Sequence, residues 1–250
     1  MKKKKNIFYL SYDGLLDPLG LSQIVPYLIL ISNNYNLEVI SFEKKNKLNE
    51  KNFQNIKKQL SDHNIQWKYF KYNKLILLNI LKVFILNVYI FYKVVRKKYI
   101  FHLRSYIPYF FIFIPNIYNK LDFIFDMRGF WFQEKIDRRN WNSKSILIKF
   151  LNKYEKKIIY ESKKTLCLTD SSIDYLLIKY PNLKRNKFIR IRTGVSKENF
   201  IYRKKKLDLD NLIFCYLGTT DGAYDFDLSL KVFLNFKKIY VNSKIKIISN

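Results

Sequence analysis

Short apolar runs alternate along the chain with longer segments in which apolar residues recur at helical spacing. The short runs predict strands at 6–12, 37–43, 65–72, 98–105, 121–129, 187–196 and 243–250, and at the starts of 164–180 and 212–238. The longer segments predict helices at 20–34 with Ser22 as a possible cap, 50–64, 75–95, 106–120 and 143–163, and at the ends of 164–180 and 212–238. This alternation is typical of an α/β, Rossmann-like, doubly wound parallel sheet with helices on both faces.

The pattern is interrupted once, by a polar and charged stretch at 196–211 that is a plausible linker. We therefore expect a first domain over 1–200 and a second beginning within 201–250. Two strands and a helix are too few to close a domain, so we expect either a truncated second domain or a partner that completes it.

The segment "FIFDMRGFWFQE" combines an apolar run with charged and aromatic residues directly after it. In open parallel sheets, ligands bind beyond the carboxyl ends of the strands, which is where this segment falls. Asp126 and Arg128 share one side of an extended stretch and can pair, Trp131 can form a stacking wall, and Glu134 follows. Carboxylates here suit proton transfer or the binding of sugar hydroxyls. The alternative is a structural Asp–Arg pair that supports the turn.

Two further loops follow predicted strands. Gly14 and Gly20 bracket a bend before a helix, where backbone N–H groups can approach an anion. The loop has neither the dinucleotide fingerprint nor the Walker A pattern, and an ordinary turn is the alternative. Arg104 ends the next strand before Ser105 and can clamp a phosphate or carboxylate, unless it is simply a surface arginine. His102 is interpreted as a packed histidine.

Near the C-terminal end of the sequence, "GTTDGAYD" follows another predicted strand. Gly218 and Asp221 lie in this loop, which can approach a ligand closely or can serve only as a turn between strand and helix.

The charge of the chain is strongly positive, with 47 Lys and Arg against 20 Asp and Glu and a formal net charge of +27. Such a charge favours a polyanionic partner: nucleic acid, an anionic membrane surface or a phosphorylated substrate. AT-rich codon usage is an alternative source of many of the lysines. No helix-turn-helix, zinc knuckle or RNP motif supports nucleic acid. Two histidines exclude a histidine-rich metal site, and two cysteines in apolar runs are consistent with free thiols in a reducing cytosol.

The most apolar segment, 75–95, is long enough to span a bilayer. Asn79, Lys82 and Asn87 interrupt it, and a lysine at the centre of a spanning helix costs roughly 2.5–3.5 kcal/mol. We therefore favour a buried or membrane-surface helix over a spanning one.

Five segments taken together resemble a bacterial subgroup of family 4 glycosyltransferases. They are "SYDGLLDPLGLSQIVPYL", "HLRSYIP", "FIFDMRGFW", "LCLTDSSIDYL" and "FCYLGTTDGAYD". The resemblance implies the two-lobed GT-B fold, with the N-terminal acceptor lobe over about 5–200 and the opening of the donor lobe after it. It also implies transfer of a sugar from a nucleotide-sugar donor, with retention and without a metal or other cofactor.

The resemblance implies roles for the residues singled out above. Catalytic roles fall on Asp126, Arg128 and Glu134; donor or phosphate binding falls on Gly14, Gly20, Gly218 and Asp221; acceptor binding falls on Arg104, Ser105 and Trp131. Arg128 and Arg104 are the cations expected near the negative charge that develops on the departing diphosphate. The family's paired glutamates lie beyond position 250, so we expect this chain to be a fragment or a truncated form.

Members of the family build envelope or capsular polysaccharide on lipid carriers at the cytosolic membrane face. The expected partners are therefore a nucleotide-sugar, a glycan or lipid-linked acceptor and an anionic membrane surface, with no nucleic acid. The expected location is cytoplasmic and peripheral on the inner face of the cell membrane, with the region Lys68–Lys98 touching that surface. The alternatives are a non-catalytic membrane docking protein and, less favoured, a basic nucleic-acid-binding protein.

Overall fold

The structure is a computed structural model that describes residues 4–49, 51–73, 75–134, 145–194, 211–220 and 225–249. The chain divides into two compact units, Met1–Val195 and Ser196–Asn250. The predicted linker at 196–211 lies outside the described residues except for its last position.

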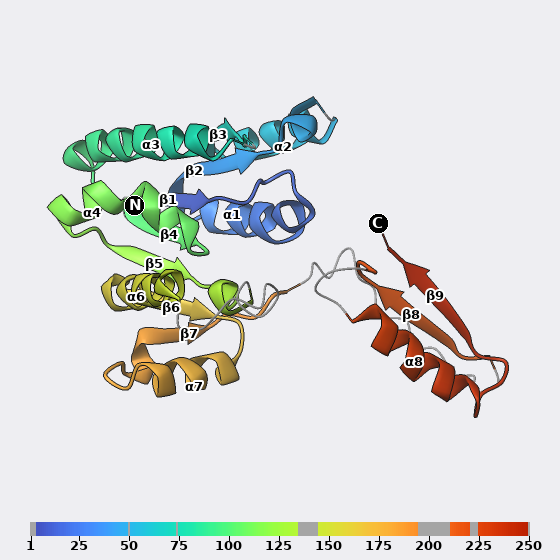
Figure 1. The fold of residues 1–250 in the computed structure, drawn as a ribbon. Helices are drawn as coiled ribbons and strands as arrows, with labels where there is room; N and C mark the ends of the chain where they lie inside the picture. The colour runs from blue at the N-terminus through green and yellow to red at the C-terminus, as the bar shows by residue number, and fades with distance from the viewer. Residues whose placement is uncertain are drawn as a thin grey trace. The chain divides into compact units, whose positions relative to one another are not determined.

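The first unit is built on a seven-stranded sheet whose paired strands are all parallel (Figure 1). The strand order is β3-β2-β1-β4-β5-β6-β7. The strands are β1 (Lys5–Ser11), β2 (Tyr35–Glu43), β3 (Gln66–Lys71), β4 (Ile100–Arg104), β5 (Phe123–Asp126), β6 (Lys164–Cys167) and β7 (Phe188–Arg190). The order reverses direction between β1 and β4, so the topological switch point lies between these two central strands.

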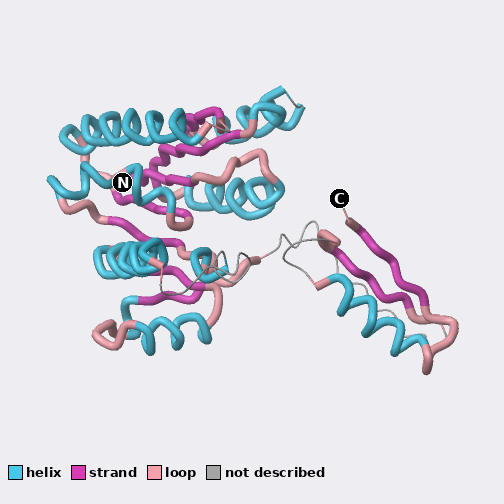
Figure 2. Tube along the Cα trace, in the orientation of Figure 1, coloured by secondary structure: helices cyan, strands magenta, loops and turns pink. Residues whose placement is uncertain are grey.

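Helices connect the strands and cover both faces of the sheet, which confirms the predicted doubly wound α/β fold (Figure 2). They are α1 (Val25–Ser32), α2 (Lys51–Asp62), α3 (Ile76–Arg96), α4 (Phe113–Asn119), α6 (Ile146–Glu161) and α7 (Asp170–Lys179). Shorter helical turns lie at Gly20–Ile24, Lys45–Asn49, Ile107–Phe111 and Arg185–Lys187.

Two boundaries differ from the sequence prediction for local reasons. The segment 20–34 begins as a π-helical turn, and Ser22 does not cap it, because its hydroxyl donates instead to the Pro18 carbonyl at 2.7 Å. The strand predicted at 121–129 stops at Asp126, because Arg128 adopts a left-handed φ of 49° that ends the extended backbone. The pattern of apolar and polar residues indicates neither the hydrogen bond of Ser22 nor the left-handed backbone of Arg128.

The alternation of side chains along the strands produces a separate core on each face of the sheet. On one face, Phe8 and Phe101 pack with Leu86 and Ile90 of α3 and with Ile158 of α6. On the other face, a smaller core gathers around α1 and α2, with members that include Tyr9, Ile24, Leu28, Val39 and Leu60.

Helix α3 is the longest helix described, and it packs on the sheet through one side only. On that side of the helix, the side chains of Leu86 and Ile90 are fully buried. The stretch Leu77–Arg96 is long and apolar enough to cross a membrane by length and composition, and 22% of it is buried. The structure therefore places this segment against the sheet, while most of its surface remains uncovered.

The second unit contains β8 (Ile213–Leu217), α8 (Phe226–Lys237) and β9 (Lys244–Ile248), with β8 and β9 paired in parallel. Asp225 caps α8 by accepting a hydrogen bond from the Leu228 amide at 2.9 Å. The ring of Phe214 packs against Phe233 and Phe236 of the helix. These elements form one strand–helix–strand layer.

Candidate functional site at the carboxyl ends of β1, β4 and β5

Two rows of polar side chains cross the sheet at the switch point. The parallel register pairs Ser11 of β1 with Arg104 of β4, and Arg104 with Asp126 of β5. One step earlier, Tyr9 pairs with His102. Residues that pair in a parallel sheet, and residues two apart on one strand, share a face. The register therefore gathers these side chains on the face that α1 covers, where the strands end.

Asp126 is the centre of this cluster and is itself buried. Its Oδ2 lies 3.5 Å from His102 Nε2 and 3.7 Å from Arg104 Nη1, and its Oδ1 lies 3.9 Å from Arg128 Nη1. Three basic side chains thus surround one carboxylate. The predicted pairing of Asp126 with Arg128 is present, but Arg104 and His102 share the same acid.

Gln23, just before α1, is hydrogen-bonded to both arginines. Its Oε1 accepts a hydrogen bond from Arg104 Nη2 at 3.1 Å and from Arg128 Nη2 at 2.7 Å. Arg128 also donates to the Thr193 hydroxyl at 3.2 Å. The side chain of Arg128 is 20% exposed and that of Arg104 is 6% exposed. Arg128 is therefore the cation that a ligand in solvent can reach, and Arg104 stands behind it.

A tight turn after β5 sets the backbone conformation of Arg128. Its positive φ of 49° and the hydrogen bond from the Gly129 amide to the Met127 carbonyl close a three-residue turn directly after β5. Ser105, after β4, is also left-handed at a φ of 67°, and its amide donates to the Asp126 carbonyl at 2.8 Å. Non-glycine residues with positive φ are uncommon and occur often at functional sites. Both strand ends thus hold their side chains through locally constrained backbone.

His102 lies between Asp126 and a tyrosine. Its Nδ1 is 3.2 Å from the Tyr27 hydroxyl, and its ring centroid is 4.7 Å from that of Tyr9. Burial, followed by the charge of Asp126, raises the pKa of Tyr27 to about 12. Tyr27 therefore stays protonated at neutral pH and can donate to Nδ1. A neutral His102 in that tautomer directs its Nε2 proton toward Asp126.

The loop after β1 is held by a buried carboxylate. Glu43 accepts hydrogen bonds from the Leu15 amide at 2.7 Å, the Leu16 amide at 3.2 Å and the Ser41 hydroxyl at 2.6 Å. Burial raises the pKa of Glu43 above its usual range, against the effect of these hydrogen bonds. The amides of Leu15 and Leu16 are therefore occupied by the protein itself.

Both glycines of this loop make close approaches. A Cβ on Gly14 would lie 2.6 Å from Glu43 Oε2, and a Cβ on Gly20 would lie 2.2 Å from the Gly14 carbonyl oxygen. Neither position has room for a side chain, so each glycine has a packing role. Donor binding by Gly14 and Gly20 stays a prediction.

The other predicted residues lie at different distances from this cluster. Trp131 is half-exposed, and its ring stacks 6.4 Å from that of Tyr106. Glu134 is exposed in the helical turn that begins at Trp131, with its Oε1 only 3.1 Å from where a Cβ on Gly129 would stand. Among the described residues, no hydrogen bond or ion pair joins Glu134 to Asp126 or Arg128. Glu134 is therefore separate from the buried cluster.

The predicted donor loop lies in the second unit. Gly218 follows β8, and its amide donates to the Ile248 carbonyl at 3.1 Å. Asp221 lies outside the described residues. The roles assigned to these two residues remain predictions.

Sequence reasoning missed several members of the cluster. His102 was interpreted as packed, and it is buried, but it also contacts Asp126 and Tyr27. The available signal was its position two residues before Arg104, which puts both side chains on one face of the strand. Gln23 lay inside the quoted segment "SYDGLLDPLGLSQIVPYL" but was not singled out. Glu43 had no comparable signal, because only the fold brings it to the loop.

The arrangement suits the binding of an anionic group. Two arginines and a histidine converge on one carboxylate. Among the residues that the structure describes, the buried Arg104 Nε and His102 Nε2 have no hydrogen-bond partner. Guanidinium groups bind carboxylate and phosphate oxygens in two-pronged geometry. Across the residues that the structure describes, no group of three or more His, Cys, Asp or Glu side chains gathers as a metal ion would require.

Comparison with known proteins shows the fold and leaves the family open. No family model matches the chain, and no curated protein matches it. Among solved structures, it is similar to Anabaena Alr3699/HepE in complex with UDP and glucose, with 10% identity, a TM-score of 0.52, and coverage of 96% of this chain and 68% of that one. It is also similar to S. aureus MnaA in complex with UDP, with 11% identity, a TM-score of 0.52, and coverage of 98% and 62%. At these identities the likeness supports a GT-B-like fold and does not identify family 4.

Proposed function

We propose that this chain is a glycosyltransferase that moves a sugar from a nucleotide-sugar donor to a glycan or lipid-linked acceptor in cell-envelope glycan synthesis. The observation that carries the proposal is the convergence of Arg104 and Arg128 on Asp126 at the switch point of the sheet. The two similar structures, which contain UDP, support a nucleotide-sugar as the donor. This chain spans 68% and 62% of those proteins, so the activity of a whole enzyme is part of the proposal.

The chemistry follows from charge. When the glycosyl bond to the donor breaks, negative charge develops on the departing diphosphate, and fixed cations lower the energy of that state. Arg128 reaches solvent beyond the strand ends, while Gln23 and Asp126 hold its guanidinium in place. Arg104 and His102 supply further positive charge or proton donors from beneath. Because these groups are fixed before the donor binds, little reorganisation is needed during the reaction.

Several finer features belong to the same proposal. They are membership of family 4, retention of configuration at the sugar carbon, independence of metal, and a location on the cytoplasmic face of the membrane. In this proposal Trp131 and Ser105 face the acceptor, Glu134 contacts sugar hydroxyls, and the loop with Gly218 and Asp221 belongs to the donor side.

The direct test is release of free nucleoside diphosphate by the full chain, with UDP-glucose, UDP-N-acetylglucosamine and GDP-mannose as donors and with membrane lipid extract as acceptor. We expect release with at least one donor, unaffected by EDTA. Replacing Arg128 by Ala should reduce the rate by about 100-fold or more, as removal of one charge-stabilising donor does elsewhere. Replacing it by Lys should retain part of the rate.

Arg185→Ala is the matched control, because Arg185 forms exposed ion pairs with Asp170 and Asp174 of α7. Among the described residues, no hydrogen bond or ion pair joins it to Arg104, Asp126 or Arg128. Its rate should equal that of the wild type. If Arg128→Ala binds and turns over donors as well as this control does, the site assignment is wrong. If no donor is bound or cleaved under any condition, a non-catalytic docking protein replaces the proposal.

A further inference from the structure

The outer side of α3 is an apolar surface that the rest of the first unit leaves uncovered. Six side chains, spaced three and four residues apart along the helix, are between 37% and 77% exposed. They are Leu77, Leu81, Phe84, Val88, Phe91 and Val95. We call them the α3 stripe. Their spacing puts them on one side of the helix, opposite the buried residues Leu86 and Ile90.

The polar residues of α3 do not interrupt this stripe, because each turns toward the protein. Asn79 donates to the Asn73 carbonyl and accepts from the Asn73 amide. The Lys82 ammonium donates to the Lys71 carbonyl at the end of β3. Asn87 donates to the Phe110 carbonyl and accepts from the Ile114 amide. The three residues that argue against a spanning helix in the sequence thus leave the outer side of α3 apolar.

The stripe continues onto a neighbouring helix. The ring of Phe91 lies 5.9 Å from that of Tyr118 on α4. Ile117 and Tyr118 are themselves 58% and 73% exposed. An uncovered apolar patch that extends over two helices is typical of a surface that binds a partner or a membrane.

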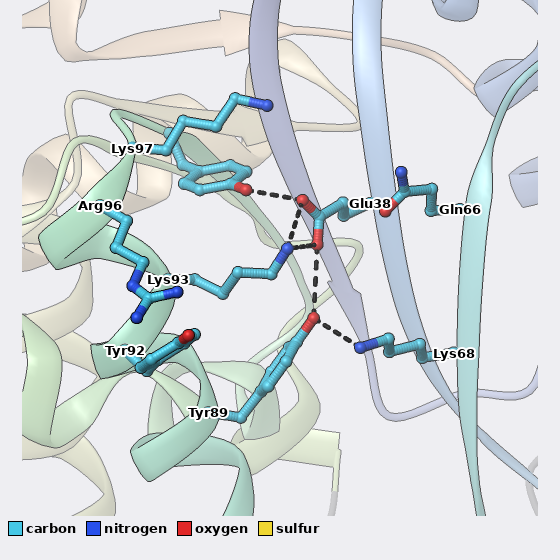
Figure 3. Close-up of a pocket in the computed structure, with 9 residues that line it drawn as sticks. Glu38, Gln66, Lys68, Tyr89, Tyr92, Lys93, Arg96 and Lys97 are labelled. Carbon is cyan, nitrogen blue, oxygen red and sulfur yellow. Dashed lines mark hydrogen bonds and ion pairs between the residues drawn. The ribbon is translucent and has the colours of Figure 1, made fainter.

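A groove runs between the other side of α3 and the strands at the sheet edge. Its first part is a cavity of about 500 Å³ beside the last turns of α3, with Lys68, Lys93, Arg96 and Lys97 around the single carboxylate of Glu38 (Figure 3). Its second part is a cavity of about 370 Å³ with an apolar lining that includes Ile40, Phe70, Ile85 and Leu86. Lys68 and Tyr89 line both parts, so the two cavities adjoin.

The basic part of the groove has more cations than its one carboxylate neutralises. Glu38 accepts from Lys93 at 2.9 Å and from the Tyr99 hydroxyl at 2.6 Å, so Lys93 is the cation that it neutralises. The guanidinium of Arg96 lies over the Tyr92 ring, 3.8 Å from its centroid, and Lys68 donates to the Tyr89 hydroxyl. Figure 3 shows Arg96 beside the ring of Tyr92, and no dashed line joins Lys97 to Glu38. Exposed cations on aromatic rings, beside an apolar surface, are the composition of a membrane-interface site.

We infer that the first unit docks on an anionic membrane through the α3 stripe, and that the groove seats one anionic phospholipid. The headgroup phosphate lies among Lys68, Arg96 and Lys97, and an acyl chain lies along Phe70 and Ile85. Charge complementarity selects this occupant. A second copy of a chain with a net charge of +27 would bring like charges together around the same patch, whereas an anionic leaflet attracts them.

The helix lies on the membrane rather than across it. Leu86 and Ile90 are fully buried against Phe8 and Phe101 of the sheet, and Asn87 is bonded to the segment before α4. Spanning the bilayer would require α3 to leave these contacts. The start of α3 also follows the carboxyl end of β3, so the stripe extends toward the edge of the sheet that carries the candidate site. Docking is independent of the proposed transfer activity, and either can fail without the other.

The test is sedimentation of the full chain with vesicles of phosphatidylcholine alone and of phosphatidylcholine with phosphatidylglycerol. We expect binding to the anionic vesicles that weakens as salt rises. Arg96→Glu/Lys97→Glu should lower the affinity by at least about 25-fold, since each basic residue near the surface contributes about fivefold. Leu81→Asp should lower it by roughly tenfold, because one apolar side chain no longer enters the interface.

Matched controls lie on the opposite face of the sheet. Lys57→Glu/Lys58→Glu on α2 changes the net charge equally, and Leu30→Asp on α1 removes a leucine that is 68% exposed, against 55% for Leu81. Both should bind vesicles within about twofold of the wild type, and thermal melting should show that all four variants fold. If the controls lose as much affinity as the targets, binding is diffuse charge attraction and the inference is overturned.

A second readout tests the groove itself. In a Trp131→Phe/Trp141→Phe variant, the remaining tryptophan, Trp67, packs on the opposite face of the sheet. Adding Ile85→Trp puts a second tryptophan in the groove, and phosphatidylglycerol with brominated acyl chains should quench the fluorescence that this substitution adds. Inorganic phosphate should not displace the protein from vesicles at matched ionic strength. The inference is overturned if the fluorescence added by Ile85→Trp is not quenched, or if phosphate binds the chain while vesicles do not. It is also overturned if light scattering shows a dimer that Leu81→Asp dissociates, since a second copy would then cover the stripe.

Discussion

The candidate site at the strand ends and the groove beside α3 use the same kinds of side chain in different surroundings. Each places one carboxylate among cations and tyrosines: Asp126 in the first and Glu38 in the second. His102 and Arg104 are buried with Asp126, whereas Arg96 and Lys97 stand exposed at the end of a helix. The comparison teaches that burial, more than composition, separates a site for one ligand from a surface for many.

The physical reason is the cost of removing charge from water. A buried charge that loses its partner is strongly destabilising, by about 3–5 kcal/mol, whereas an exposed pair contributes about 0–1 kcal/mol. In the strand-end cluster, removal of one charged side chain would leave its buried partner unpaired and lower the stability of the fold. The positions of these side chains are therefore fixed by one another. The groove cations are largely solvated, so each can exchange water for a headgroup oxygen. The predictions that follow run from the largest expected effect to the smallest.

The strongest test removes the central acid of the strand-end cluster. Asp126→Ala leaves His102, Arg104 and Arg128 facing one another without a carboxylate, and we expect the free energy of unfolding to fall by about 3–5 kcal/mol. Chemical denaturation followed by circular dichroism measures it. Asp122→Asn is the control, because its pair with Lys163 at 3.2 Å is exposed and should contribute less than about 1 kcal/mol. Equal losses would erase the distinction between buried and exposed charge.

The loop above the cluster should be equally intolerant of added volume. Gly20→Ala puts a Cβ 2.2 Å from the Gly14 carbonyl oxygen, where only a backbone shift makes room. We expect a loss of about 1–3 kcal/mol in unfolding free energy. Gly194→Ala adds the same methyl group where none of the described residues lies within 4 Å, and it should change stability little. A tolerated alanine at position 20 would show that this loop is not held rigidly.

Removal of the acid in the groove should lower stability only slightly and should strengthen binding to anionic vesicles. Glu38→Gln frees Lys93 and weakens the hydrogen bond to Tyr99, so we expect a loss of about 1 kcal/mol in stability. Affinity for anionic vesicles should rise by about fivefold, because one more cation faces the headgroups. Denaturation and vesicle sedimentation measure the two effects on one variant. A fall in vesicle affinity would contradict the headgroup site.

The smallest expected effect concerns pH. Burial raises the pKa of Glu43 above 4.5, its ordinary value, so the folded chain holds this proton more tightly than the unfolded chain does. The contribution of the group to stability is then greatest below the unfolded pKa and declines as pH rises through the folded pKa. The stability difference between wild type and Glu43→Gln should therefore be larger near about pH 4 than near about pH 7. A difference that grows with pH would show that the hydrogen bonds outweigh the burial.

The sequence predicted much of the strand-end site because strands end in recognisable ways. Asp126 and Arg128 stood directly after an apolar run, and Arg104 closed the previous one. Parallel strands end at the same edge, so these residues were expected to be neighbours. Glu134 was grouped with them partly on sequence proximity; the structure puts it in an exposed helical turn with its carboxylate beside Gly129, and its role stays a prediction. The pairing of His102 with Tyr27 joins positions 75 residues apart and leaves no local signal.

The groove shows the converse. The apolar segment and its lysines were visible in the sequence, and a membrane-surface helix was favoured. That Asn79, Lys82 and Asn87 all turn inward was not visible, because their partners are backbone groups of β3, the loop after it and the segment before α4. These contacts turn the three polar side chains away from the outer side of α3, so the apolar stripe there is continuous.

The sequence by itself determined the alternation of strands and helices, the α/β class and the positions where strands end, because periodicity and chain breakers act within a few residues. The tertiary structure alone decided the strand order, and with it the switch point between β1 and β4. It also decided that Gln23 bridges two arginines and that Glu43 occupies the glycine loop. These contacts depend on register and packing between distant segments, for which the local pattern carries no information.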